Sequence, residues 1–398
     1  MHITFVDDAD AVPRALAELD EPVVGVDVER ADGDRYFRAA ALVQVGVTSR
    51  CVLLDALAIA DLSALDSFLD GRLVVLHALE NDLDPLASSG VHPERVADTA
   101  IAAMLLGLPT GLSPLLHELL EVPITEEKER FQRADWTARP LTDELQQYAA
   151  GDVVHLPAAW ADLERRLEEA GRTSWYAEEL AASVERAGET RRAWTRVRGT
   201  GKLDGRGRAI LRALWEEREA VARQHDVAPQ RLIRDEVMVD LSQRPPRRLG
   251  DLPSRGVRRA PARDYGARFI EAIQRGADAP AEKATSGLRR SDRDDRKRYD
   301  RLRHARSAVA QQIGVDSGVL CPSQALWRAV LSDPDDPDEL VASAGLRQWQ
   351  AGLLRDVLWE AFTLPEEAES ADEGDAGTGQ QVATDDGTPP PTTTSQPT

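Results

Sequence analysis

The sequence predicts an α/β domain with a mixed β-sheet, followed by an all-helical second half. In the first 170 residues, short apolar runs with strand character alternate with amphipathic helical patterns, and this alternation is typical of an α/β domain. From about Trp194 to about residue 363, only helical periodicity remains. A chain of 398 residues is long enough for two or three such domains.

The first half contains four short apolar runs that read as buried strands, at residues 23–27, 40–47, 51–55 and 73–77. Helical patterns cover residues 9–19, 62–69, 82–88, 96–106, 112–120 and 141–170. The uncharged stretch 99–116 has the composition of a membrane span. Because two glycines and two prolines interrupt it, we expect two short helices in a soluble core instead.

The second half shows two similar helical stretches. Residues 205–224 carry apolar side chains at helical spacing, and a second helical run begins at Pro229, a residue that suits a first helical turn. Residues 301–362 repeat this theme, with a helix start at Pro322. We expect a linker between the two stretches. After Pro365 the chain is acidic, rich in Thr and Pro and without periodicity, which predicts disorder.

Charge is distributed unevenly along the chain. The net charge is −20, yet residues 244–263 hold seven Arg and one acid, and residues 289–306 hold nine basic residues and four acids. Such local basic stripes can bind phosphate groups although the total charge is negative. They can equally be solvated helix faces or linkers. Residues 366–398 contain eight acids and no Lys or Arg, so this segment would compete with nucleic acid for the arginines.

The compartment expected from the sequence is the cytoplasm. The chain opens with MHITFVDDADAV, which has neither the basic nor the apolar region of a secretory signal. Cys51 and Cys321 lie far apart in sequence, and neither has a metal-type or redox-type partner. We therefore expect both thiols to be reduced and no membrane partner.

Four carboxylates and one tyrosine carry the chemistry that the sequence predicts. Asp27 and Glu29 lie two residues apart on a predicted strand and so share a face. Tyr148 and Asp152 lie four apart on a predicted helix and also share a face, and Asp82 opens another helix. Acids gathered in one pocket repel one another. Divalent cations, which prefer oxygen ligands, can hold such a cluster together, and two of them form a clamp for phosphoryl displacement.

Each of these residues also has a simpler interpretation. Asp27 and Glu29 could form a solvated strand end, Asp82 could cap a helix, and Tyr148 could be a core aromatic. For His77 we favour a structural hydrogen bond, for His155 a packing role, and for Trp136 a core position. Arg139 could contact substrate phosphate or form a structural salt bridge. The sequence RGTGKL at residue 198 lacks the spacing of a phosphate-binding loop.

The order and spacing of the acids resemble the DEDD exonuclease superfamily, in the subgroup with a tyrosine in its third motif, and most closely ribonuclease D. The segment ADWTARPLTDELQQYAAGDV, residues 134–153, carries the most specific similarity. ERADGDRYFRAAALVQVG, which starts at Glu29, and Asp55 also match the family pattern. Val28 stands where the family often has Thr, which leaves both carboxylates in place. Both helical stretches resemble HRDC domains.

The resemblance implies a ribonuclease-H-like 3′–5′ exonuclease domain at residues 1–187 and an HRDC domain at 203–276. It further implies a linker at 277–295, a second HRDC-like domain at 296–364 and the acidic tail at 365–398. Two divalent ions, Mg²⁺ or Mn²⁺, would bind to Asp27, Glu29, Asp82 and Asp152. Asp27 would touch both ions, and Tyr148 would orient the attacking water.

The implied activity is hydrolysis of the 3′-terminal phosphodiester of RNA with a free 3′ end, such as a tRNA precursor, releasing nucleoside 5′-monophosphates. We expect a monomer in which the exonuclease domain provides chemistry and the helical half provides grip. One alternative is a DNA-directed exonuclease of the same superfamily. Another is a non-catalytic nucleic-acid-binding protein, although such a scaffold would not need all four acids and Tyr148. A metal phosphatase would need a His-rich site that the sequence lacks.

Overall fold

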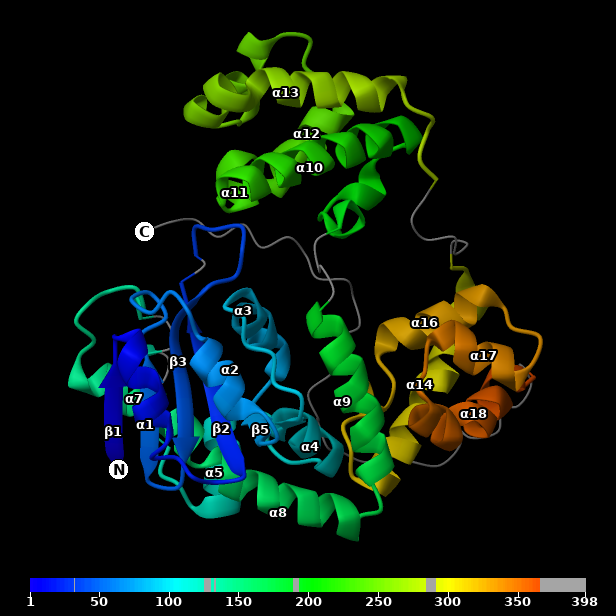
Figure 1. The fold of residues 1–398 in the computed structure, drawn as a ribbon. Helices are drawn as coiled ribbons and strands as arrows, with labels where there is room; N and C mark the ends of the chain where they lie inside the picture. Colours follow the sequence, from blue (N-terminus) through cyan, green and yellow to red (C-terminus); the bar gives the residue numbers. More distant parts are fainter. Residues whose placement is uncertain (32, 125–129, 132–133, 189–192, 284–290, 366–398) are drawn as a thin grey trace.

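The computed structural model describes residues 1–31, 33–124, 130–131, 134–188, 193–283 and 291–365. We refer to residues 1–188 as the α/β domain, to 193–283 as the first helical unit and to 291–365 as the second helical unit. Figure 1 shows the first helical unit above the α/β domain and the second beside helix α9. The predicted acidic tail from residue 366 and part of the predicted linker, residues 284–290, lie outside the described residues.

The α/β domain contains a six-stranded mixed sheet with strand order β1-β4-β3-β2-β5-β6. Its strands are β1 (His2–Val6), β2 (Val23–Arg30), β3 (Ala40–Val47), β4 (Arg50–Leu54), β5 (Leu73–Leu76) and β6 (Val96–Asp98). Strand β3 is antiparallel to β2 and β4, whereas the other pairs are parallel. The mixed sheet predicted from the sequence is confirmed.

Two of the six strands were not predicted. Strand β1 falls in a segment that carried no predicted element, and β6 occupies the first three residues of the predicted helix 96–106. Both pair in parallel with strands far along the chain, β1 with β4 and β6 with β5. A three-residue strand is too short to show a period of its own, so only its pairing reveals it.

The α/β domain has helices on both faces of the sheet. They are η1 (Ala9–Ala11), α1 (Val12–Leu16), α2 (Ser63–Leu69), η2 (Leu79–Asn81), α3 (Leu83–Ser88), α4 (Thr99–Leu106), α5 (Leu112–Leu120), α7 (Asp143–Val154), α8 (Leu156–Glu169) and α9 (Thr173–Gly188). The stretch 99–116 forms two short helices, as predicted. Among the described residues, no helix is both long and apolar enough to cross a membrane.

The predicted single helix over residues 141–170 is wrong, because the structure contains two helices that meet at His155. Pro157 lies in the first turn of α8. Its ring nitrogen has no hydrogen to donate to the carbonyl of Val153, so α7 cannot continue through this position. Helix α9 had no counterpart among the predicted elements.

A pair of glycines lets helix α7 approach the sheet closely. Gly25 on β2 lies opposite Gly46 on β3. A Cβ on Gly25 would lie 2.3 Å from the carbonyl oxygen of Val153, and one on Gly46 would lie 2.6 Å from its Cγ2. Side chains at i, i+2 and i+4 share a strand face, so Asp27 and Glu29 project toward α7 as well. The alternate face of β2, with Val24, Val26 and Val28, packs into the opposite core.

The first helical unit is a small bundle with its own core. It contains η3 (Trp194–Arg196), η4 (Thr200–Lys202), α10 (Gly205–His225), α11 (Pro229–Leu232), α12 (Asp235–Gln243), η5 (Leu249–Asp251), η6 (Pro253–Arg255) and α13 (Arg259–Asp278). The helical run predicted from Pro229 is two helices, because Ile233 and Arg234 are extended. Leu211, Leu214, Met238 and Phe269 are fully buried at its centre.

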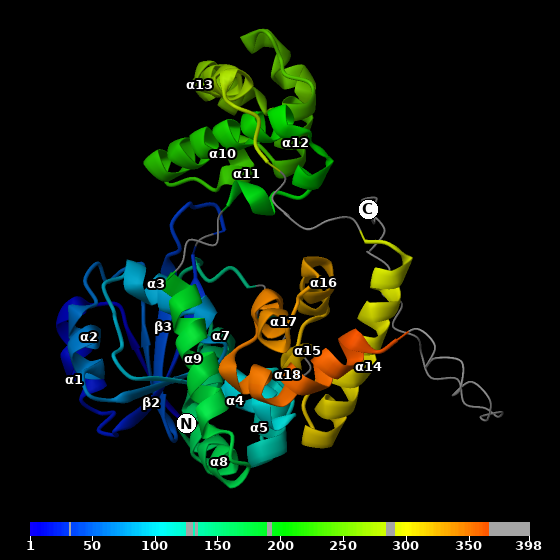
Figure 2. The same cartoon turned by 90° about the vertical axis from the view of Figure 1, so that its right-hand side faces the viewer.

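The second helical unit shares its core with the α/β domain. It contains α14 (Arg293–Ile313), α15 (Ser317–Leu320), α16 (Ser323–Ser332), α17 (Pro337–Ala344) and α18 (Gln348–Thr363). Its buried side chains and those of α4, α7 and α8 form one apolar cluster. Figure 2 shows α16, α17 and α18 beside α9 and close to α4 and α5. Cys321 in this unit and Cys51 in the sheet are both buried, and both are free, which agrees with the predicted reduced thiols.

Candidate active site

A pocket of about 640 Å³ opens beside strand β2. Its lining residues are Asp27, Val28, Glu29, Arg30, His77, Ala78, Asn81, Asp82, Gly111, Leu112, Pro114, Tyr148 and Asp152. They come from β2, from the turn after β5, from the start of α5 and from α7. The structure therefore brings all five predicted site residues to one pocket, although they span more than 120 positions of sequence.

Three carboxylates lie in one tight group. Oxygen atoms of Asp27, Glu29 and Asp152 all lie within 4.8 Å of one another. Strand β2 runs three residues beyond its predicted end, so both acids belong to the strand, and a bulge follows between Glu29 and Arg30. The close approach of α7 at Gly25 places Asp152 over this pair. Oxygen ligands at this spacing fit a divalent cation.

Asp82 reaches the pocket from a strained turn. Ala78, directly after His77, adopts the left-handed conformation with φ 62°, which is uncommon for a residue other than glycine and often marks a functional site. Asp82 occupies the N-cap position of α3, yet its side chain makes no capping hydrogen bond. It is 3% exposed, and its Oδ2 atom has no hydrogen-bond partner among the described residues. The Asp82 carboxylate therefore remains available to a ligand in the pocket.

Asp98 holds this turn in place, and its role was missed in the sequence. Its Oδ2 accepts a hydrogen bond of 2.6 Å from the backbone N–H of Leu79. Its Oδ1 caps α4 by accepting from Ala100 and Ile101. An Asp immediately before a helical run is a recognisable N-cap signal, but the predicted helix 96–106 included strand β6, which ends at Asp98.

The acids raise one another's pKa values. Burial, with the nearby Asp27 and Asp152, raises the pKa of Glu29 to about 9, against a smaller opposing effect of Arg30. Burial also raises the pKa of Asp82 well above its usual range, and Asp27, Asp98 and Glu29 add to the increase. Such a pocket favours either protonated acids or added positive charge.

Tyr148 and Asp152 lie one turn apart on α7. Burial raises the pKa of the Tyr148 phenol, and the carboxylates of Asp152 and Glu29 raise it further. Its ring packs near Phe131 and Trp136, with ring centres 5.2 and 6.2 Å away. The phenol consequently keeps its proton near neutral pH and faces the acids as a hydrogen-bond donor.

The remaining predicted residues have structural contacts. His77 Nδ1 lies 2.8 Å from Thr99 Oγ1, which agrees with the predicted hydrogen bond, and Trp136 is buried in the core as expected. The half-buried His155 lies at the junction of α7 and α8. Arg139 donates to both carboxylate oxygens of Asp55, at 2.6 and 2.7 Å. These contacts favour the structural salt bridge over the phosphate contact for Arg139.

Comparison with known proteins identifies the family of this chain. A family model described as 3′–5′ exonuclease matches residues 3–168, and the HRDC domain model matches residues 207–273 and 295–354. A ribonuclease D of Granulibacter bethesdensis is 32% identical, with 84% of this chain and 87% of that protein aligned. This chain belongs to the ribonuclease D family. The order of domains expected for ribonuclease D, an exonuclease domain followed by HRDC modules, is confirmed.

Other ribonuclease D relatives align over a shorter part of the chain. The protein of Gluconacetobacter diazotrophicus is 33% identical over 68% of this chain and 70% of its own length. That of Pseudomonas paraeruginosa is 34% identical over 62% of this chain and 66% of its own length. The fold agrees with the crystal structure of Escherichia coli RNase D, with a TM-score of 0.76, 23% identity and coverage of 91% and 98% of the two chains.

Proposed function

We propose that this member of the ribonuclease D family hydrolyses the 3′-terminal phosphodiester of RNA and releases nucleoside 5′-monophosphates. The observation that carries this proposal is the convergence of Asp27, Glu29, Asp82 and Asp152 with Tyr148 in one pocket. Arg30 is the one Lys or Arg side chain among its described lining residues. A pocket with four acids and so little positive charge is costly unless it serves chemistry that needs cations.

The donor set fits two divalent cations, Mg²⁺ or Mn²⁺. All four candidate ligands are carboxylates, the Oδ2 of Asp82 has no partner among the described residues, and the raised pKa values favour added positive charge. When bound, such ions provide hydroxide from water near neutral pH and neutralise charge on the leaving oxygen. Asp27, grouped with Glu29 and Asp152, is the candidate to touch both ions, as the family resemblance implies.

The side chains of the protein would orient the reaction. Tyr148 keeps its proton, so it would donate a hydrogen bond to the attacking water and not accept its proton. Asp152, one turn away, would keep that water next to the acidic group. The raised pKa of Glu29 favours its protonated form in the absence of cations, so cation binding would displace a proton.

The substrate is proposed to be RNA because the relatives are named ribonuclease D. Precursors of tRNA are the family-level expectation, and a monomer acting in the cytoplasm is the simplest form. A DNA-directed exonuclease uses the same acids, so it remains the second candidate. Matched RNA and DNA oligonucleotides of one sequence separate the two.

The test uses 5′-end-labelled RNA with Mg²⁺, with Mn²⁺ and with chelator. We expect stepwise shortening from a free 3′ hydroxyl, resistance of a 3′-phosphate end, and no cutting of circular RNA. Asp27→Asn should lower the rate by roughly 10³-fold with the fold intact, because it removes charge from the acidic group. Asp61→Asn, an exposed acid outside the pocket, is the matched control. Internal cuts, or Asp27→Asn activity within about tenfold of wild type at saturating Mn²⁺, would refute the proposal.

A further inference from the structure

One aromatic ring stands apart from the others in this chain. All the Trp, Tyr and Phe residues fall in the described part of the chain, and only Phe37 is exposed, with 49% of its surface accessible. It lies in the loop between β2 and β3, which we call the 33–39 loop. A single exposed apolar side chain is ordinary, so the surroundings of Phe37 decide whether it has a role.

The first helical unit holds the 33–39 loop in a fixed conformation. Asp226, at the end of α10, accepts hydrogen bonds from the backbone N–H groups of Tyr36 at 3.1 Å and Phe37 at 3.0 Å. The backbone N–H of Ala228 donates to the carbonyl of Asp34 at 2.8 Å. Figure 1 shows this loop rising from the sheet to the first helical unit. The loop backbone is therefore ordered before any ligand binds.

Tyr36 and Phe37 differ sharply in their surroundings. Tyr36 is 8% exposed and belongs to the apolar core of the first helical unit, where Arg223 donates to its hydroxyl at 3.2 Å. Phe37 touches Tyr36 edge-on, with ring centres 5.2 Å apart, and leaves much of its own ring in solvent. Tyr36 thus anchors the loop, while the Phe37 ring remains accessible to a ligand.

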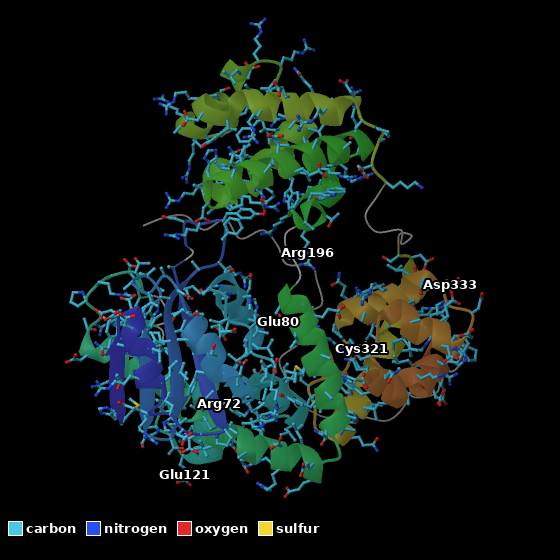
Figure 3. All side chains as sticks on the ribbon, in the orientation of Figure 1. Arg72, Glu80, Glu121, Arg196, Cys321 and Asp333 are labelled. Carbon is cyan, nitrogen blue, oxygen red and sulfur yellow. The ribbon has the colours of Figure 1, made fainter. Side chains whose placement is uncertain are left out.

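The same loop adjoins the rim of the acidic pocket. Arg30, which lines the pocket, pairs with Ala40 across the hairpin, so Phe37 lies at most about 10 Å along the chain from that rung. Arg38 forms an ion pair with Asp84 at 3.3 Å and approaches the carbonyl of Glu80 at 3.4 Å. These residues flank Asp82. Glu80, labelled in Figure 3 near the top of α9, is itself held by Arg186 at 2.9 Å.

We propose that Phe37 is a stacking platform for one base of the single-stranded RNA that leads out of the pocket. The inference rests on the proposed function and adds the path of the substrate. An exposed aromatic face binds any base, because every base has a π-face, and neighbouring arginines favour the phosphate backbone. Because the loop is already ordered, stacking needs little further loss of conformational freedom. Asp226 is a positioning residue, since it acts through the loop.

The first experiment maps the stacked base on the full-length protein. Single-stranded RNAs of twelve nucleotides carry 2-aminopurine at successive positions from the 3′ end and are bound in Ca²⁺. We expect an additional loss of 2-aminopurine fluorescence at one position, within the first few nucleotides upstream of the 3′ end. That loss should vanish in Phe37→Ala, persist in Phe37→Trp and be weak in Phe37→Leu. A fluorescence profile that is the same in wild type and Phe37→Ala would overturn the inference.

The second experiment links the ring to turnover. With Mn²⁺, Phe37→Ala should raise KM for the twelve-nucleotide RNA roughly tenfold and leave kcat within about twofold. An abasic residue at the mapped position should raise KM for the wild-type protein and cause no further rise for Phe37→Ala. Asp226→Ala should share the KM effect, whereas Asp226→Asn, which keeps an acceptor oxygen, should show less of it.

The outcomes separate this inference from the proposed function. Unchanged KM in Phe37→Ala, while wild-type protein trims RNA from its 3′ end, overturns the stacking platform and leaves the exonuclease proposal intact. Absence of trimming by the wild-type protein overturns the exonuclease proposal, and the 2-aminopurine profile then judges the platform by binding alone. Since Phe37 is exposed, the thermal midpoint of Phe37→Ala should match that of wild type, which checks that folding is unaffected.

Discussion

The two helical units resemble the same module but join the α/β domain in different ways. In the second unit, Trp349 stacks on Trp175 of α9 with ring centres 4.8 Å apart and donates its Nε1–H to Glu179 at 2.9 Å. Gly107, after α4, approaches Gly314, after α14, so closely that a Cβ would lie 2.3 Å from the Gly314 carbonyl. The first unit has a core of its own, into which Tyr36 of the 33–39 loop inserts, and its other contacts with that loop are polar.

This difference separates a structural attachment from an adjustable one. A continuous apolar core stabilises both partners together, because neither can expose its face without losing buried area. A junction of one buried ring, backbone hydrogen bonds and exposed ion pairs contributes less stability, since water replaces the polar contacts at small cost. We therefore interpret the second unit as part of the folded core and the first as a device that positions the loop beside the pocket. Truncations, substitutions and changes of pH test this difference between the two units.

The largest effect should come from removing both units. A fragment that ends near Ala187 keeps the pocket and should still trim short single strands. It should bind long RNA more weakly, with a shallower salt dependence, because it lacks the arginines outside the α/β domain. It should also unfold at lower denaturant, since the α9 face with Trp175 and Glu179 loses its partner.

A chain that ends after the first unit, near Glu282, sharpens this test. It should be as unstable as the shorter fragment if the second unit is the structural one. Denaturant unfolding and filter binding across a salt series measure both properties. Equal stability of the 187-residue fragment and the full chain would contradict the structural role. If the 187-residue fragment and the full chain bind RNA with equal affinity and equal salt dependence, the helical units do not provide the RNA affinity.

A single substitution at the junction of the second unit should lower the unfolding free energy more than one at the junction of the first unit. Trp349 is 5% exposed, and truncation of a buried Trp to Ala costs about 3–5 kcal/mol. Trp349→Ala should lower the unfolding free energy of the α/β domain by about that amount. Tyr36→Ala should instead loosen the first unit and change the main unfolding midpoint much less. Urea unfolding monitored by circular dichroism measures both. A larger effect of Tyr36→Ala would reverse our interpretation.

The pH dependence should come from the pocket and not from either junction. The Glu29 pKa is raised to about 9 in the folded chain, against an ordinary value of 4.5. The folded state therefore binds more protons than the unfolded state between these values, so the metal-free protein should lose stability as pH rises through this window. Asp82, whose pKa is also raised, acts in the same direction.

Unfolding free energies in chelator at pH 6 and pH 8.5 test this expectation. The decrease should be smaller in Glu29→Gln and unchanged in Trp349→Ala. Mn²⁺ should raise the melting temperature more at pH 8.5 than at pH 6, because the cations then displace fewer protons. Stability that rises between pH 6 and pH 8.5 in chelator would show that other groups dominate.

The smallest effect should come from the ion pair between Arg231 and Asp34. Nε of Arg231 lies 2.7 Å from Asp34 Oδ1, but the two side chains are 55% and 68% exposed. Exposed pairs contribute about 0–1 kcal/mol. Arg231→Ala should thus leave the unfolding free energy within about 0.5 kcal/mol of wild type at physiological salt. A change several times larger, measured by the same urea titration, would mean that the first junction carries more stability than its contacts indicate.

Features that depend on local backbone geometry could be predicted from the sequence. Asp27 with Glu29 and Tyr148 with Asp152 are fixed by the periods of a strand and a helix, so their shared faces could be predicted from spacing. The helices of the second half follow from apolar periodicity, and the split of residues 99–116 follows from Gly and Pro. The break before α8 also has a local signal, because Pro157 favours the first turn of a new helix.

Features that depend on partners far along the chain could be identified from the folded structure alone. Strands β1 and β6 are too short or too weakly patterned to appear without their parallel neighbours. The state of the Asp82 carboxylate follows from Asp98 and the turn at Ala78, and the role of Arg139 from Asp55, 84 positions away. The hydrogen bond from the backbone N–H of Tyr36 to Asp226 joins residues 190 positions apart. Packing and burial in the folded chain select such contacts. They therefore leave no periodic pattern in the local sequence.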